Sequence, residues 1–292
     1  MSHDIDQRLI DMLSYRRPHD SDTELEFTKR FIDPYDPGRD EFGNMYINVG
    51  AWSRTLFTCH VDTVHHKPGR QKLGYVESEG LLVLADKESN CLGADDAAGV
   101  WVMLNMIDAG IPGTYLFHRA EERGGQGSKW IEANWPTWLE AFDRAVAFDR
   151  RGTNSVITHQ LNYERGCSSE FANALCAQLG RDWYPDDSGI FTDTAFYFSR
   201  IPECTNISTA YEDEHSEAES LNWPALRLIL GQVLAVKWDD LPVRRTLTQE
   251  VYDCGYASYE AMTEDQAWDL VERDPDIAVQ LLMRAYGKEY DE

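Results

Sequence analysis

The sequence lacks a membrane-spanning stretch, a paired-cysteine motif and any excess of basic residues. No run of about 18 apolar residues occurs in the 292-residue chain, so we expect no transmembrane helix. The 27 Lys and Arg residues stand against 51 Asp and Glu residues, which gives a formal net charge of -24. Such a charge repels phosphate backbones and anionic lipid surfaces, so we expect neither nucleic acid nor a membrane as a partner.

The six cysteines are spread along the chain without a Cys-x-x-Cys pair. This distribution is typical of neither a zinc knuckle nor a disulfide-rich secreted domain. The amino-terminal residues are polar and acidic, and they lack the basic and apolar regions of a signal peptide. These features predict a reduced, cytoplasmic setting.

What the chain does contain is enough apolar material for a packed core. Hydrophobic residues make up 42% of it and aromatic residues 12%, and its length suits one large α/β domain or two modest ones. The last 54 residues differ, with 14 acids against 5 bases and no ligand-like cluster. We therefore expect a catalytic domain over 1–238 and an acidic, mainly helical appendage over 239–292.

One apolar segment ends in a chemically distinctive tip. Residues 56–64 read as a buried strand that runs out into His60-Val61-Asp62. Residues i and i+2 of a strand share a face, so His60 and Asp62 can point into one site. A metal-bound imidazole usually has its second nitrogen held by a carboxylate or carbonyl, which gives Asp62 a physical role.

Further potential ligands follow where other apolar segments end. Asp95 and Asp96 precede an expected helix near 97–107, where capping explains one acid better than two. Charged side chains at the ends of apolar strands fall where α/β folds place their ligand sites. The remaining candidates are Glu121 and Glu122 after 114–120, Asp149 after 145–148, and His215 in an acidic stretch after 203–208.

The order and chemistry of these residues suit a pair of divalent ions. Two histidines and three carboxylates can hold two ions when one carboxylate bridges them. Nitrogen and oxygen ligands without thiolate favour Zn²⁺, with Co²⁺ or Mn²⁺ possible. Two such ions can polarise a carbonyl and stabilise a tetrahedral intermediate, and one further carboxylate is then needed as a base.

Over roughly residues 5–236 this series resembles the co-catalytic di-zinc exopeptidases, the clan of M28 aminopeptidases and the related M20 and M42 peptidases. The resemblance implies a cis peptide bond between Asp95 and Asp96. It also implies that Glu121 is the general base acting on a metal-bound water, and that Asp62 orients His60. The implied ligands are His60 and Asp149 for one ion, Glu122 and His215 for the other, and Asp95 for both.

The resemblance further implies the fold class: α/β, with three layers and a central mixed β-sheet. M20 enzymes insert a lid domain of about a hundred residues between the equivalents of Asp149 and His215. Here that interval is 215 - 149 = 66 residues, so we expect a single catalytic domain without an M20-type lid. The M28-like branch fits best, although the sequence around His215 is closer to the pattern of the M20 and M42 peptidases.

The leading hypothesis is thus a zinc metallopeptidase, an M28-like aminopeptidase acting on peptides or amino-acid amides. The alternative on the same scaffold is an amidohydrolase or deacylase that prefers N-acyl amino acids. A metal-binding or partner-binding protein without activity is a third reading, which the intact Glu121-Glu122 pair disfavours. The oligomeric state is not predicted.

Several other residues keep two interpretations. Tyr211 either stabilises an oxyanion or packs, and Arg150 with Arg151 either contacts substrate or balances acids. Asp193 either borders the pocket or lies elsewhere. The remaining expectations are structural: Cys59 and His118 packed in the core, and His65 with His66 in a solvated loop.

Overall fold

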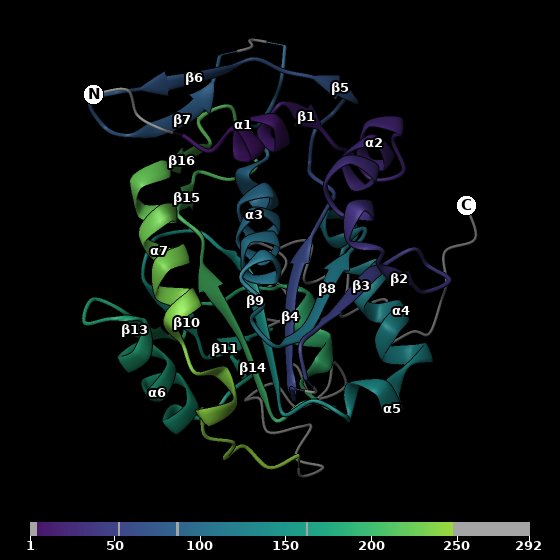
Figure 1. Ribbon diagram of the computed structural model, residues 1–292, viewed down its shortest axis with the longest axis vertical. Coiled ribbons are helices and arrows are strands. Elements are labelled where there is room, and N and C mark those ends of the chain that lie inside the picture. Colours follow the sequence, from purple (N-terminus) through teal and green to yellow (C-terminus); the bar gives the residue numbers. More distant parts are fainter. Residues whose placement is uncertain (1–4, 52, 86–87, 162, 248–292) are drawn as a thin grey trace, which may run out of the picture. The chain divides into compact units, whose positions relative to one another are not determined.

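The computed structural model describes residues 5–51, 53–85, 88–161 and 163–247 (Figure 1). Among these residues, no helix combines the length and the apolar character needed to cross a bilayer. A first compact unit covers Met1–Thr246. The expected appendage falls largely on 248–292, outside the described residues, and stays a prediction.

The first unit is organised around an eight-stranded mixed sheet in the order β13-β10-β14-β9-β4-β8-β3-β2. Its centre is parallel: β14 pairs with β9, β9 with β4, and β4 with β8. Antiparallel strands complete both sides. The strands of this sheet are β2 (Gly38–Arg39), β3 (Met45–Val49), β4 (Thr55–His60), β8 (Gly113–His118), β9 (Arg144–Arg150), β10 (Ser155–Ile157), β13 (Tyr184–Asp186) and β14 (Glu203–Ser208).

Helices cover both faces of the sheet. On one face α3 lies against β4 and β9, with α1 and α7 beside α3 and α6 beside α7 (Figure 1). On the other, α4 and α5 pack with the 3₁₀ helix η3. The helices are α1 (Gln7–Leu13), α2 (Asp22–Phe31), α3 (Ala94–Asp108), α4 (Gln126–Asn134), α5 (Pro136–Leu139), α6 (Ser169–Leu179) and α7 (Trp223–Ala235), with 3₁₀ turns η1 (Asp33–Tyr35), η2 (Glu121–Arg123), η3 (Asp193–Tyr197) and η4 (Trp238–Asp240).

Burial along β4 shows why three layers form. All six residues of β4 are buried, and neighbouring side chains enter different cores. Phe57 belongs to the core beneath α3, whereas Leu56 belongs to the core beneath α4 and α5. A strand that is apolar on both faces needs cover on both. The predicted three-layer α/β fold with a central mixed sheet is confirmed.

Local sequence signals set several helix starts. Ser21 and Ser168 accept the backbone N–H groups of Glu24 and Phe171 at 3.1 Å, and so cap α2 and α6. Asn222 caps α7 at 3.0 Å, with a proline in its first turn. The segment 126–139 forms α4 and α5, although its sequence pattern predicts no regular element.

A second, four-stranded sheet brings the His215 loop to the main sheet. Its order is β15-β16-β7-β6, with β15 (Tyr211–Glu212) and β16 (Ser220–Asn222) forming a hairpin. Residues 213–219 connect these two strands, and β16 pairs with β7 (Leu81–Leu84), which pairs with β6 (Leu73–Val76). Two short pairs complete the strands: β1 (Tyr15–Arg16) with β5 (Gly69–Arg70), and β11 (His159–Gln160) with β12 (Glu164–Arg165).

The expectation of a single catalytic domain without a lid is also confirmed. Between Asp149 and His215, the described residues form α6, the 3₁₀ helix η3 and strands β10 to β15 of the same unit. Residues just beyond 238 belong to this unit as well. Asp239 accepts a bond from Ser53 at 2.7 Å, and the backbone N–H of Arg244 binds Glu203 at 2.6 Å.

Gly99 tests the close approach of α3 to the sheet. A Cβ atom there would lie 2.0 Å from the carbonyl oxygen of Phe148, so Gly99→Ala forces helix and strand apart. We expect a loss of about 2–3 kcal/mol in the free energy of unfolding, measured with denaturant. Gly231→Ala on α7, where a Cβ meets nothing within 4 Å, is the control and should gain about 0.5–1 kcal/mol. Equal stability of the two variants would contradict this packing.

Candidate metal centre

Three of the predicted ligands meet at the carboxyl ends of β4 and β9 and the start of α3. His60 Nε2 lies 2.9 Å from Asp95 Oδ1 and 3.5 Å from Asp149 Oδ1. His60 is 1% exposed, and Asp95 is 8% exposed. Ligand atoms of all three residues lie within 4.8 Å of one another, which suits one divalent ion.

A second group shares one residue with the first. His215 Nε2 lies 3.2 Å from Asp95 Oδ2 and 3.0 Å from Glu122 Oε1. The two oxygens of Asp95 thus face different groups, Oδ1 toward His60 and Oδ2 toward His215. A carboxylate with its two oxygens placed in this way would be able to contact two ions. The structure brings together all five predicted ligands, and the Asp95–Asp96 peptide bond is cis.

Glu121 lies beside these ligands. Atoms of His60, Glu121 and Glu122 form a further group within 4.8 Å. Both glutamates sit in η2, directly after β8, where Ala120 turns the chain with a φ of 58°. The base predicted from sequence therefore reaches the cluster without belonging to either of the two groups that contain Asp95.

Asp62 contacts both the histidine and the glutamate turn. Its Oδ1 lies 3.7 Å from His60 Nδ1, while the nearer partner of that nitrogen is the Asp62 backbone oxygen at 3.1 Å. The carboxylate accepts the backbone N–H groups of Glu121 at 3.1 Å and Glu122 at 3.2 Å. Asp62 therefore holds η2 in place in addition to lying behind His60.

Other side chains hold the backbone of further ligands, a part that their local sequence does not predict. Asp96 accepts the N–H of His60 at 3.2 Å, and Glu219 accepts that of Asp95 at 3.0 Å. Asn206 binds both the N–H and the carbonyl of Asp149, at 2.9 and 2.7 Å. Nothing in the local sequence separates Asn206 and Glu219 from surface polar residues, because their role depends on which distant backbone they meet.

Two hydroxyls complete the surroundings of Asp149. Thr192 donates to its Oδ2 at 2.7 Å and Tyr211 to its Oδ1 at 3.2 Å. Tyr211 is 3% exposed and thus packs against the ligand set, which favours a structural contact. Arg150 and Arg151 lie near Asp186 and Glu214, respectively, and so balance acids.

His118 is packed in the interior, as expected, and Asp193 is packed beside it. Its Nδ1 lies 2.9 Å from Asp193 Oδ2, and its Nε2 lies 2.6 Å from the hydroxyl of Tyr197. Ser128 donates to the other oxygen of Asp193 at 2.5 Å. Each of the four side chains is at most 3% exposed. Asp193 therefore belongs to this internal network, and Cys59 is likewise buried.

Crowded carboxylates shift the proton affinities of the cluster. Burial, followed by the charge of Asp95, raises the pKa of Glu122 to about 7 and that of Asp149 to about 6. Burial is also the largest cause that raises the pKa of Glu121 well above its ordinary value. Hydrogen bonds to Asp95 and Glu122 raise the pKa of His215 to about 11. The cluster thus concentrates negative charge that bound protons or cations must balance.

The residues fit a pair of divalent ions. Glu122 Oε1 is buried, and it lies 3.0 Å from His215 Nε2, another ligand of its group. The donor set contains two imidazoles and three carboxylates, and among the described residues no thiolate joins the groups. This chemistry suits Zn²⁺, while Co²⁺ and Mn²⁺ accept the same ligands.

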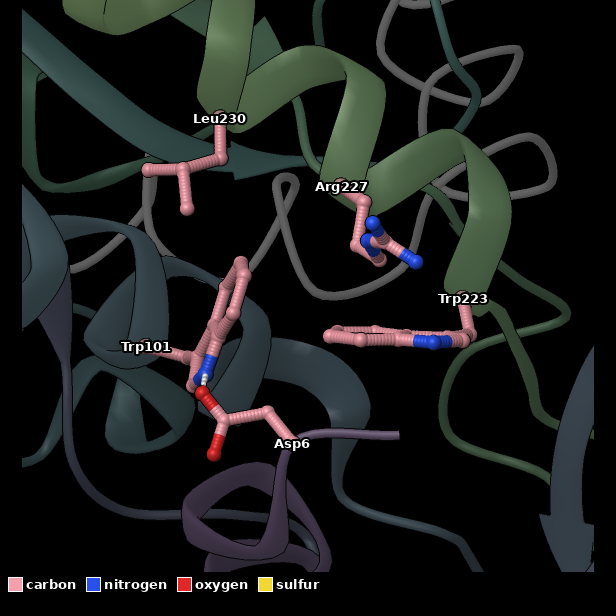
Figure 2. Close-up of a pocket in the computed structure, with 5 residues that line it drawn as sticks. All are labelled: Asp6, Trp101, Trp223, Arg227 and Leu230. Carbon is pink, nitrogen blue, oxygen red and sulfur yellow. Dashed lines mark hydrogen bonds between the residues drawn. The ribbon is translucent and has the colours of Figure 1, made fainter. Parts of the chain in front are cut away.

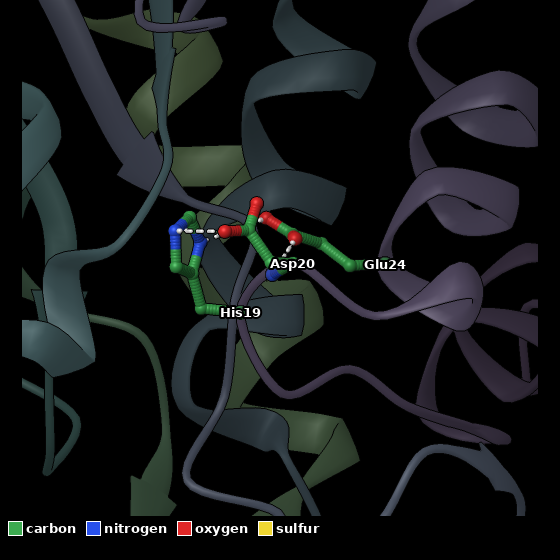
Figure 3. A group of neighbouring side chains, drawn as sticks. All are labelled: His19, Asp20 and Glu24. Carbon is green, nitrogen blue, oxygen red and sulfur yellow. Dashed lines mark hydrogen bonds and ion pairs between the residues drawn. The ribbon is translucent and has the colours of Figure 1, made fainter.

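A third cluster with ligand-like side chains lies outside this centre. His19, Asp20 and Glu24 face one another in Figure 3. Arg119 already binds Glu24 through two nitrogens at 3.0 and 2.8 Å, and Asp20 at 3.0 Å. The two nitrogens of His19 point to different acids, Nε2 to Asp20 and Nδ1 to Glu24. This is an ion-pair network built on an arginine.

A pocket of about 390 Å³ also lies apart from the ligands. In Figure 2 the rings of Trp101 and Trp223 meet edge to face, at a centroid distance of 5.4 Å. Asp6 accepts the indole N–H of Trp101 at 2.8 Å, and Arg227 lies over Trp223. Leu230 completes the wall, and none of these residues belongs to the metal-ligand groups.

Solved structures share this fold. Aminopeptidase PepT from Bacillus cereus superposes with a TM-score of 0.63 at 16% identity, covering 79% of this chain and 98% of that one. A tripeptidase from Staphylococcus aureus gives 0.63 at 15% identity, with 79% and 97% covered. The TET1 peptidase of Pyrococcus horikoshii, described as assembling into a tetrahedron or an octahedral shell, gives 0.56 at 15% identity, with 78% and 98% covered. The chain therefore shares the fold of these three structures. No protein-family model and no curated protein matches it.

The position of His65 differs from the one predicted from the sequence. The sequence predicts that His65 and His66 lie in a solvated loop, but His65 is 3% exposed, whereas His66 is exposed. Its Nδ1 lies 2.6 Å from the Thr63 hydroxyl, and its Nε2 lies 3.1 Å from both Gln71 Oε1 and the carbonyl of Cys91. The loop folds back on the amino-terminal side of α3, which the sequence pattern did not indicate.

The buried state of His65 predicts a pH-dependent stability. Burial lowers its pKa from 6.5 to about 3, so between these values the unfolded chain binds a proton that the folded chain does not. His65 thus contributes stability that is lost as the pH falls below 6.5. In urea unfolding, we expect the stability gap between wild type and His65→Gln to narrow by about 2 kcal/mol from pH 7 to pH 5. His66→Gln is the control, and a constant gap for His65→Gln would contradict the assignment.

Proposed function

We propose that the protein is a metal-dependent peptide hydrolase, most specifically an M28-like di-zinc aminopeptidase. The observation that carries the proposal is the position of Asp95, whose two oxygens face two separate ligand groups. Glu121 lies beside both as a carboxylate that neither group needs. Peptidases of the same fold support the reaction class.

The ligands assigned to the ions are His60 and Asp149 on one side, Glu122 and His215 on the other, and Asp95 between them. Held by these residues, two zinc ions would supply Lewis acidity to a carbonyl group and to water. The chain's own task is to hold these ligands and to move protons. Asp62, which accepts the N–H of Glu122, and Glu219, which accepts that of Asp95, perform the first task.

Glu121 performs the second task as general base. Its carboxylate takes a proton from the attacking water and returns it to the departing amine, so the side chain ends as it began. Its raised pKa, caused chiefly by burial, brings its proton affinity closer to neutral pH, where such transfers are efficient. Asp62 keeps the base in place through the N–H of Glu121.

A deacylase acting on N-acyl amino acids is the second candidate, because the same ligands and base cleave any amide. The similar structures described as aminopeptidase and tripeptidase favour the first. The expected substrate is a peptide or amino-acid amide. The proposed setting is cytoplasmic, as expected from the spread of the cysteines along the sequence.

Glu121→Gln tests the base. The substitution keeps the size of the side chain but removes its proton affinity, so we expect kcat to fall by a factor of at least about 10² while two zinc ions remain bound. Activity and metal content are measured on the same preparation. Glu140→Gln, at an exposed site that pairs with Arg200, is the matched control. Retained activity in Glu121→Gln with full metal content would remove Glu121 from this role.

A substrate panel separates the two candidate functions. We expect cleavage of peptides and amino-acid amides with a free amino terminus, loss of activity with a chelator, and recovery on adding Zn²⁺, because the ligands hold their ions reversibly. N-acetylated versions of the same substrates should be cleaved poorly. Preference for the N-acyl substrates would favour the deacylase, and inactivity towards all of them with two zinc ions bound would favour a non-catalytic protein.

A further inference from the structure

We propose that Glu219 and Arg17 are positioning residues for the metal centre, which together set Asp95 in its place between the two ion sites. Neither residue belongs to the ligand groups, and neither touches the reacting atoms in the proposed mechanism. The inference rests on the proposed two-zinc site. It concerns how that site is formed before any ion binds.

Glu219 binds the backbone of the Asp95 loop through both of its oxygens. Oε2 accepts the N–H groups of Leu92 at 2.8 Å and Gly93 at 2.9 Å, and Oε1 accepts that of Asp95 at 3.0 Å. Glu219 is 1% exposed. A buried carboxylate is costly unless its lone pairs are used, and these three bonds use them. The loop that carries the bridging ligand therefore closes around this carboxylate.

Arg17 holds the same loop from its carbonyl side. Its Nη2 donates to the carbonyl of Gly93 at 3.2 Å, and its Nε donates to that of Val61 at 2.9 Å. Val61 lies between His60 and Asp62, so one guanidinium ties the histidine strand to the Asp95 loop. Arg17 is 0% exposed, and its Nη1 donates to the carbonyl of Met12 at 3.4 Å. Its guanidinium thus donates to three backbone carbonyls.

The peptide groups of Gly93 lie between the two side chains. Its N–H binds Glu219, and its carbonyl binds Arg17. Gly93 has a φ of 72°, and a Cβ atom there would lie 2.8 Å from His65 Cε1. Only glycine fits this conformation and this space. The position of Asp95, two residues later, follows from a turn held on both sides.

Glu219 also joins the two halves of the second ion site. It lies four residues after His215, in the loop between β15 and β16, and its own N–H binds the carbonyl of Ser216 at 3.2 Å. The side chain of Glu219 thus connects the loop of His215 to the loop of Asp95. Asp95 and His215 come from distant parts of the sequence, and Glu219 forms hydrogen bonds to the backbone of both loops.

Glu219→Gln is the direct test. An amide offers one acceptor oxygen, so its NH₂ group must face at least one of the three backbone N–H donors. Removing such a supporting bond typically weakens metal binding about 10–100-fold. We expect calorimetric titration of the metal-free protein with Zn²⁺ to show this loss, and hydrogen exchange of the metal-free variant to show lost protection over 92–95.

Glu203→Gln is the matched control. Glu203 is also 0% exposed, and its carboxylate accepts the backbone N–H groups of Ser168 at 2.6 Å, Arg244 at 2.6 Å and Arg245 at 3.0 Å. It caps backbone away from the ligand groups. We expect Glu203→Gln to lower the melting temperature and to leave Zn²⁺ affinity unchanged.

The outcomes separate this inference from the proposed function. Wild-type protein that binds no Zn²⁺ would overturn the two-zinc site itself. Wild-type protein that binds two ions, with Glu219→Gln binding them equally well, would overturn only the positioning role. If Glu219→Gln does not fold, Glu219→Asp replaces it, because the carboxylate is kept and only withdrawn by one methylene. A folded Glu219→Asp with wild-type affinity for both ions would then overturn the proposal.

Discussion

Hydrogen bonds from backbone N–H groups to buried side-chain oxygens hold the candidate metal centre together. Asp96 binds the backbone of His60, Asp62 binds that of Glu121 and Glu122, and Glu219 binds that of Asp95. Asn206 does the same for Asp149. Buried carboxylates require such partners, and loops without regular structure require acceptors for their N–H groups. The buried carboxylates accept the N–H groups of these loops, so both requirements are met by the same hydrogen bonds. Burial of the carboxylates and the geometry of the ligands are therefore linked.

This linkage depends on the order of the strands. His60 and the glutamate turn meet because β4 and β8 are parallel neighbours, and Asp149 joins them because β9 lies on the other side of β4. Asp95 enters from α3, which packs across these strands. A parallel sheet places the carboxyl ends of its strands at one edge, and a ligand site forms there. The close contact at Gly99 is one condition for that approach.

His215 differs from the other ligands. Its side chain is 49% exposed, whereas those of His60 and Asp95 are 1% and 9% exposed, so the centre meets solvent on the His215 side. It sits at a φ of 64° in a hairpin loop of the smaller sheet. Among the described residues, Glu219 is the side chain that connects this loop to the Asp95 loop through backbone bonds. The smaller sheet thus completes a site that the main sheet begins.

The sequence by itself determined the class of fold and predicted the candidate ligands of the centre. Strand ends marked by His60, Glu121 and Asp149 are local features, because a strand pattern and the residue that ends it lie within ten residues of one another. Only the tertiary structure decided what Glu219, Asn206 and Arg17 do, and it placed His65 in the interior rather than in solvent. The physical reason is that a polar side chain has the same local pattern whether it faces water or a distant backbone. The difference arises when strand register and loop packing bring that backbone within hydrogen-bonding distance.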